Sequence, residues 1–140
     1  MRYFAPLLIG LAVSSCTAAP PSAETSAFAA RQQARLAALT AGKIAGPALS
    51  CLPSYRRNDM IVIDENTIVF RDGSRRVYVN HMNGGCNGLE YGNNALVTRT
   101  TSTQLCRGDI AEVLDTSSRM PISGCVFGDF VPYTTAGARY

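Results

Sequence analysis

Short runs of β-branched and aromatic residues alternate with turn residues from residue 60 onward. Residues 60–64, 67–71 and 75–79 are rich in Val, Ile, Phe and Tyr, which favour strands. Asp72-Gly73 separates the second run from the third, and this dipeptide is typical of hairpins because glycine readily adopts the positive φ that the turn needs. The pattern predicts an antiparallel meander of three strands.

The remainder of the chain continues this pattern less regularly. Residues 80–94 contain four glycines and five asparagines, which predicts an irregular loop. We expect further strands at 95–100, 110–115 and 125–131, with a turn or short strand at 104–109. The expected fold class is mainly β: five or six short strands over residues 50–133, forming a small antiparallel barrel or a curved sheet, followed by a tail over residues 134–140.

A helix is expected ahead of the strands. Residues 28–41 are rich in Ala, Arg, Gln and Leu, which favour helix, and Phe28, Leu36 and Leu39 form a thin apolar stripe. Two interpretations remain open. We favour a spacer helix packed loosely on the domain over a basic helix lying on a membrane surface. Glycines 42 and 46 end this short helix or spacer, which we assign to residues 28–46.

The N-terminal pattern is that of an exported protein. Arg2 precedes an apolar run over residues 3–13, which is too short to span a bilayer because a spanning helix needs about 20 residues. Val13-Ser14-Ser15-Cys16 resembles the lipobox of bacterial lipoproteins, in which the cysteine is acylated and becomes the mature N-terminus. We therefore expect a signal peptide over residues 1–15 and lipidation of Cys16.

The first expected partner is therefore a membrane. We expect the N-terminal lipid to anchor the protein to it on the side facing the periplasm. Thr17, which follows the cysteine, slightly favours the outer membrane. Residues 16–27, with adjacent prolines at 20 and 21, are expected to form an extended tether. The alternative is an ordinary signal peptide cut after Ala19, in which case Cys16 is lost.

The cysteine count agrees with export. Of five cysteines, lipidation of Cys16 leaves four, and an even set in an exported protein indicates two disulfides. Three pairings are open, of which we prefer Cys86 with Cys106 and Cys51 with Cys125. A zinc site is the competing interpretation, but the sequence lacks the short Cys-x-x-Cys or His-x-x-x-His spacings of structural zinc sites. We expect no metal and no cofactor.

Charge and motifs exclude several function classes. The formal net charge is +3 over 140 residues, which is too mild to indicate nucleic-acid binding in an exported protein. The sequence has no Gly-x-Ser-x-Gly elbow and no phosphate-binding glycine loop. His81, the single histidine, falls in the glycine-rich loop, and Asp64, Glu65 and Asp72 are explained as turn residues. We assign no catalytic residue.

Two sets of residues are candidates for binding. Arg71, Arg75 and Arg76, with Arg56 and Arg57 before them, cluster in sequence around the predicted meander. Guanidinium groups bind carboxylates and phosphates, so this patch could hold an acidic envelope protein or an anionic polymer. An ordinary solvated face is the favoured interpretation. The second set, Tyr78 and Tyr91, could form a stacking surface for a small ligand or a glycan.

A group of cysteines, glycines and strand residues carries a resemblance to a known family. The residues are Cys51-Leu52, Arg71 with Val77-Tyr78, Cys86-x-Gly88-Leu89 and Leu105-Cys106-x-Gly108-Asp109-Ile110. Their arrangement, over about residues 50–132, is similar to that of a family of short, uncharacterised secreted or lipoprotein-like proteins of Gram-negative bacteria. The resemblance implies a domain of unknown function behind a signal peptide and supplies no catalytic residue.

These observations together lead to one expected function and two alternatives. We expect a non-enzymatic lipoprotein of the cell envelope with a protein-interaction or structural role. The first alternative is a small-ligand or glycan-binding β-barrel module, and a hydrolase is the less favoured second alternative.

Overall fold

The computed structural model of the chain describes residues 23–53, 59–100 and 102–137. The predicted signal peptide, Cys16, Arg56 and Arg57 lie outside these ranges. The described residues form the helix α1 (Ala23–Thr40) and mostly β structure, which confirms the expected fold class. The strands are β1 (Lys43–Ala45), β2 (Met60–Asp64), β3 (Thr67–Asp72), β4 (Arg76–His81), β5 (Asn94–Arg99), β6 (Ile110–Asp115), β7 (Pro121–Val126) and β8 (Phe130–Thr135).

The strands form two antiparallel sheets. The larger sheet has the order β1-β8-β4-β3-β2, and the smaller has the order β5-β6-β7. The predicted meander is confirmed as β2-β3-β4, in which Met60 pairs with Phe70 and Phe70 with Tyr78. The barrel, however, is not formed, because β2 and β5 remain edge strands of separate sheets.

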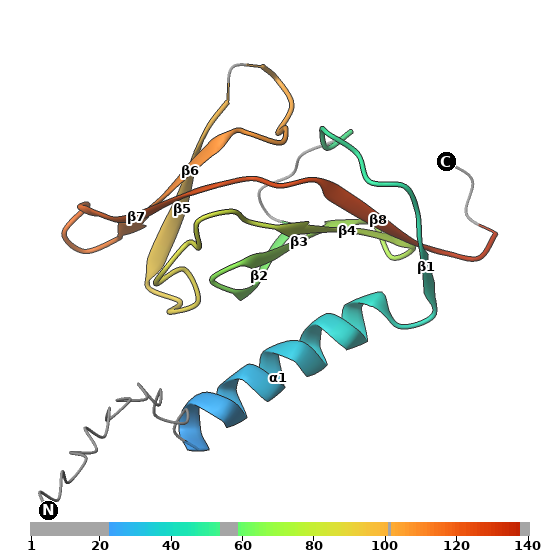
Figure 1. Cartoon of the computed structure of the whole chain (residues 1–140), viewed down its shortest axis with the longest axis horizontal. Coiled ribbons are helices and arrows are strands. Elements are labelled where there is room, and N and C mark those ends of the chain that lie inside the picture. Colours follow the sequence, from blue (N-terminus) through green and yellow to red (C-terminus); the bar gives the residue numbers. More distant parts are fainter. Residues whose placement is uncertain (1–22, 54–58, 101, 138–140) are drawn as a thin grey trace, which may run out of the picture.

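The larger sheet is covered on both faces, by α1 on one and by the β5-β6-β7 sheet on the other (Figure 1). The side chains of β3 alternate between these two covered faces. Ile68 and Phe70 point into the core between the sheets, whereas Val69 points toward the helix. The rings of Phe70, Phe127 and Phe130 pack together in the core between the sheets, with centroids 5.8–6.3 Å apart. A strand buried on both faces needs the continuous apolar run that β3 has.

The helix is held only loosely. No side chain of α1 is buried, and Leu36 and Leu39 lie half-buried against the sheet. Arg35 Nη1 donates a hydrogen bond to the carbonyl oxygen of Val62 (3.2 Å), and Lys43 Nζ donates to that of Leu39 (2.8 Å). The cation of Lys43 thus lies where the helix dipole is negative. These contacts agree with a spacer helix packed on the domain.

Several predicted boundaries are wrong, and β4 also extends to His81, which therefore lies on a strand and not in the predicted loop. The helix begins at Ala23, so residues 23–27 are helical rather than part of a tether. The predicted spacer contains β1, a strand of the larger sheet. The predicted last strand at 125–131 is two strands, β7 and β8, in different sheets. Strand β8 runs into the predicted tail as far as Thr135.

Two disulfides form, as expected, but the preferred pairing is wrong. The bonds are Cys51–Cys106 and Cys86–Cys125. Cys51 and Cys106 lie opposite each other in an isolated antiparallel bridge, beside a hydrogen bond from Leu52 N to Leu105 O (2.8 Å). Cys125, on β7, faces the core and reaches the loop that contains Cys86. Both bonds indicate that the protein folds in an oxidising, exported environment.

Candidate functional site

The predicted arginine patch is not a single surface. Alternation along β3 and β4 sends Arg71 to the helix side of the larger sheet and Arg76 to the opposite side. Arg76 lies 3.7 Å from the carboxylate of Asp72 and donates a hydrogen bond to the hydroxyl of Tyr78 (3.3 Å). Arg75 is exposed beside the β3–β4 turn. An anionic polymer would therefore not meet these three guanidinium groups together.

The two candidate tyrosines are also separated. Tyr78 is 2 % exposed and belongs to the core, whereas Tyr91 is 64 % exposed in the loop before β5. Tyr78 borders a hollow with Pro47, Leu49 and Arg76, and Tyr91 borders a different one. The predicted tyrosine stacking surface is therefore not formed.

Histidine and carboxylate side chains make local structural contacts. His81 Nδ1 lies 3.4 Å from Thr67 Oγ1, its neighbour across β3 and β4. Asp109 Oδ2 accepts a hydrogen bond from the backbone N–H of Cys106 (2.7 Å). Among the described residues no three His, Cys, Asp or Glu side chains are placed to hold a metal ion.

Asp115 closes the β6–β7 hairpin. Its Oδ1 accepts hydrogen bonds from the backbone N–H groups of Ser118 (2.7 Å) and Ser117 (2.8 Å), and from the Ser118 hydroxyl (3.1 Å). The Ser118 backbone bond, then the Ser118 hydroxyl and the Ser117 backbone, stabilise the charged form and hold the pKa of Asp115 below its usual value. Asp115 therefore stabilises the β6–β7 turn.

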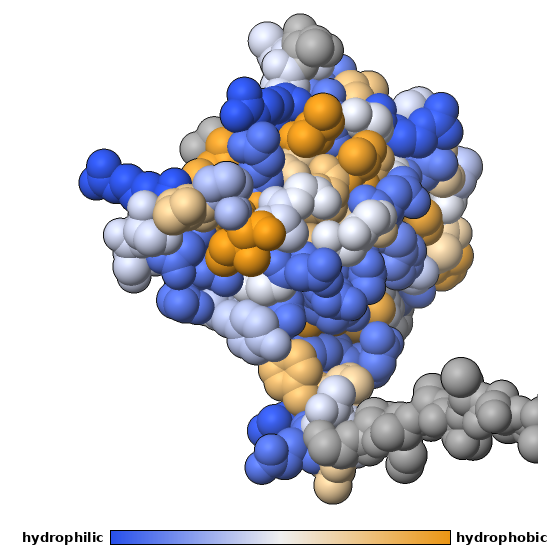
Figure 2. Space-filling model, turned by 60° about the vertical axis from the view of Figure 1, so that its left-hand side comes forward, coloured by the Kyte–Doolittle hydropathy of each residue, from blue (hydrophilic) through white to orange (hydrophobic). Residues whose placement is uncertain are grey.

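The smaller sheet has an apolar outer face, directed away from the core. Its residues lie in three cross-strand rows: Arg99–Ile110–Val126, Val97–Glu112–Gly124 and Ala95–Leu114–Pro121. Alternate rows hold Ala111, Val113 and Cys125, which are buried. Ile110 is 50 % exposed and Val97 39 %. Figure 2 brings this side of the molecule forward and shows apolar side chains exposed among polar ones.

Three of the four sheet edges carry features that hinder the pairing of another strand. Strand β1 has only three residues. Strand β2 has a register shift between Val62 and Asp64, and the carbonyl oxygen of Val62 already accepts a hydrogen bond from Arg35. Strand β7 begins with Pro121, its pairing with β6 shifts register, and Val126 exchanges both backbone hydrogen bonds with Asn83. Short length, bulges, proline and covering segments are the usual protections of edge strands.

Among the residues that the structure describes, none gives strand β5 such a protection. Its six residues pair with β6 in unbroken register, from Asn94 with Asp115 to Arg99 with Ile110. It contains no proline, and its one charged residue, Arg99, is ion-paired with Glu112 on the neighbouring strand (3.1 Å). An edge of this kind presents backbone donors and acceptors to an incoming strand.

A cleft of about 430 Å³ lies between the N-terminal half of α1, the β2–β3 turn and the loop before β5. We call it the α1 cleft. Glu90 Oε2, one of its acidic oxygens, is buried and has no hydrogen-bond partner among the described residues. The side chains that border the α1 cleft are Thr25, Phe28, Ala29, Gln32, Gln33, Asp64, Glu65, Glu90 and Tyr91.

The sequence interpretation missed both the β5 edge and the α1 cleft. The cleft joins side chains from α1, from residues 64–65 and from residues 90–91, which are far apart in the chain. The only sequence sign of it is that acidic residues stand beside Tyr91 and beside the β2–β3 turn. The freedom of the β5 edge depends on strand order, which alternating hydrophobicity does not reveal.

The chain matches no protein-family model, no curated protein and no solved structure. The resemblance to secreted proteins of Gram-negative bacteria thus rests on the residues quoted for it and stays a prediction. Within the part of the chain that the structure describes, no helix is both long enough and apolar enough to cross a membrane.

Proposed function

We propose that this is a lipid-anchored protein of the cell envelope that binds another protein and does not act as an enzyme. The lipobox-like Val13-Ser14-Ser15-Cys16 and the apolar run before it support acylation at Cys16 and a position facing the periplasm. Thr17 slightly favours the outer membrane. The two disulfides support export, because such bonds persist in oxidising compartments.

The unprotected edge of β5 is the observation that carries the binding role. The partner contributes an extended segment that adds to β5 as a fourth strand of the smaller sheet. Backbone hydrogen bonds supply affinity in this mode, and alternate side chains supply specificity. An apolar residue of the partner beside Val97 would extend the apolar outer face, while the residue next to it would lie near Leu96 at the core.

Hydrogen exchange of the β5 amides tests this role. The protein in native envelope membranes is compared with the same protein purified in a mild detergent. We expect residues 94–99 to exchange about tenfold or more slowly in the membranes, because a partner strand satisfies their outward N–H groups. Residues 121–126, on the other edge of the sheet, serve as the internal reference and keep the same rate.

A matched pair of variants separates strand addition from general surface contact. Val97→Lys puts a charge on the β5 outer face and removes the protection of residues 94–99. Ile44→Lys makes the same change on β1, at an exposed position on a short edge strand. This variant should leave the protection of residues 94–99 unchanged. Equal exchange in membranes and detergent would overturn the binding role. If the purified protein is a dimer whose β5 amides are protected, the partner strand comes from a second copy of this chain.

A further inference from the structure

We propose that the α1 cleft binds an organic cation, namely a primary ammonium or a guanidinium group on an apolar stem. The cleft does not use the β5 edge, so this site is independent of the partner strand proposed above. The inference rests on the charge of the cleft wall, an unpartnered buried oxygen, two aromatic side chains and the spacing of the carboxylates.

The charge of the α1 cleft is negative on every lining element that carries charge. Asp64 and Glu65 come from the β2–β3 turn and Glu90 from the loop before β5, and no basic side chain lines the cleft among the described residues. Asn66 partly compensates the first two. Its backbone N–H donates to Asp64 Oδ1 (2.9 Å), and its Nδ2 donates to Glu65 Oε1 (3.4 Å).

Glu90 lacks such compensation at one of its oxygens. Glu90 Oε2 is buried and accepts no hydrogen bond from the described residues. A buried carboxylate oxygen without a donor is costly, and groups left in this condition need an explanation such as a ligand. This oxygen is closed to solvent, so the Glu90 side chain must turn toward the cleft for an N–H donor of a bound cation to reach it and offset the charge of its neighbours.

Aromatic side chains border the same space. Phe28 projects from α1 and Tyr91 from the loop, and both line the α1 cleft with Glu90. Tyr91 is 64 % exposed, so its ring is open to a ligand that enters the cleft. A cation placed near a ring face is attracted by its quadrupole, and the apolar stem of the ligand gains contact with the rings.

The spacing of the carboxylates favours an organic cation over a metal ion. No three acidic, histidine or cysteine side chains of the described residues are close enough to share a metal. A guanidinium group spreads its N–H donors over three nitrogens, and an ammonium group can bond one carboxylate without the close set of ligands that a metal ion needs. The volume of about 430 Å³ is within the range of small-molecule sites.

One wall of the α1 cleft is fixed and the other is adjustable. The loop is held by the Cys86–Cys125 disulfide, by a hydrogen bond from Cys86 N to Glu65 O (2.6 Å) and by one from Tyr91 N to Gly88 O (3.2 Å). The opposite wall is α1, which buries no side chain. Its contacts with the core are at Leu36 and Leu39, outside the cleft, so the N-terminal half of the helix can adjust to the stem of the ligand.

Calorimetric titration of the intact mature protein, in a neutral detergent, tests this site. The probes are spermidine, Nα-acetyl-lysine amide and Nα-acetyl-arginine amide, each at matched ionic strength. We expect saturable one-to-one binding of at least one probe. Binding of spermidine and of neither amide would identify the ligand as a free polyamine. Binding of either amino-acid amide would identify it as a basic side chain of another polypeptide.

Four variants distinguish the site from general attraction between charges. Glu90→Gln should weaken binding about tenfold or more, and Phe28→Ala and Tyr91→Ala should each weaken it about fivefold. Glu112→Gln removes one charge from the outer face of the smaller sheet and should leave affinity unchanged. Glu90→Gln removes an unpartnered charge, so its melting temperature should not fall. No saturable binding of any probe, or equal loss with Glu90→Gln and Glu112→Gln, would overturn the proposal.

Discussion

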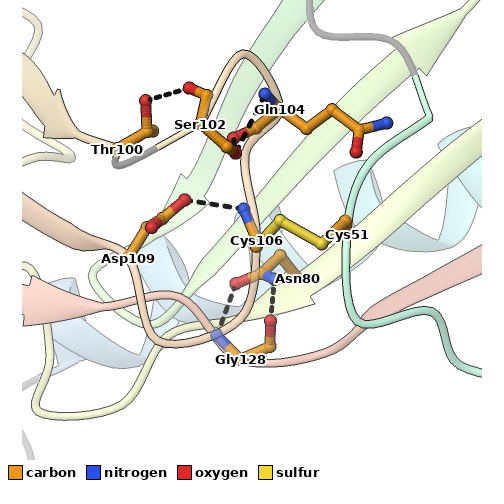
Figure 3. The surroundings of a disulfide bond; sticks show 8 residues. All are labelled: Cys51, Asn80, Thr100, Ser102, Gln104, Cys106, Asp109 and Gly128. Atoms are coloured by element: carbon orange, nitrogen blue, oxygen red, sulfur yellow. Dashed lines mark hydrogen bonds between the residues drawn. A yellow bond between two sulfur atoms is a disulfide. The ribbon is translucent and has the colours of Figure 1, made fainter.

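Asn80 and Gly128 exchange two hydrogen bonds across the point where the chain passes from one sheet to the other (Figure 3). Asn80 Nδ2 donates to Gly128 O (2.8 Å), and Gly128 N donates to Asn80 Oδ1 (3.2 Å). Both residues are buried. This amide pair replaces the ladder bonds that the backbone loses between β7 and β8, so one side chain fixes the segment between these strands beside β4.

Replacing Asn80 with leucine should destabilise the domain by about 2–4 kcal/mol. The leucine has a similar volume but leaves the N–H and the carbonyl of Gly128 buried without their partner. The free energy of unfolding in urea measures the effect. Asn87→Leu, at an exposed position, should change it by less than about 0.5 kcal/mol. Equal effects of the two variants would contradict this role of Asn80.

Gly128→Ala should cost about 2–3 kcal/mol or prevent folding. A Cβ at residue 128 would collide with the backbone carbonyl oxygen of His81. Gly124→Ala is the matched control, since a Cβ at residue 124 would meet its nearest atom, Ala111 O, at 3.9 Å. Thermal unfolding of the two variants compares them directly, and a stable Gly128→Ala would argue against the close approach of β4 and the crossover.

Removal of either disulfide should cost about 4 kcal/mol on the chain-entropy model. The bonded cysteines are 55 residues apart in Cys51–Cys106 and 39 in Cys86–Cys125, and the entropy term grows only slowly with loop length. Each bond is removed by replacing both of its cysteines with alanine. Urea unfolding should give similar losses for the two double variants, and a negligible loss for either would contradict its place in the fold.

Asp115 should contribute stability that depends on pH. Because its folded-state pKa is lowered by the Ser118 and Ser117 hydrogen bonds, the contribution is complete above the usual aspartate pKa and is lost as pH falls through the folded value. Asp115→Ala should therefore melt below the parent protein at pH 7, and the difference should shrink at pH 2–3. A difference that grew on acidification would contradict this assignment.

Sequence pattern predicts an element well where turn residues limit an apolar run on both sides. Strand β2 and strand β6 begin and end at the predicted residues, because Asp64-Glu65-Asn66 and Asp109 or Asp115 mark their limits. The strand predicted at 125–131 contains Gly128-Asp129, which the sequence interpretation did not treat as a break. The dipeptide is a local sign of the interruption, whereas the close contact of Gly128 with β4 depends on a segment far away in the chain.

Contacts between distant segments account for the other errors. The preferred disulfides paired cysteines by their place in the chain, whereas Cys51 pairs with Cys106 because residues 49–52 run beside both β8 and Leu105. Pro20 and Pro21 predict that residues 23–27 belong to a tether, yet their Ala, Glu, Thr and Ser residues form the start of α1. The α1 cleft escapes prediction for the same reason, since three separate segments build it.

The intact mass of the protein extracted from membranes, before and after reduction and thiol alkylation, tests the central claim most directly. An exported lipoprotein should give the mass of a chain that begins at acylated Cys16. The other four cysteines should alkylate only after reduction, and peptides should link Cys51 with Cys106 and Cys86 with Cys125. A mass without acyl groups, or cysteines that alkylate without reduction, would contradict a lipid-anchored protein folded outside the cytosol.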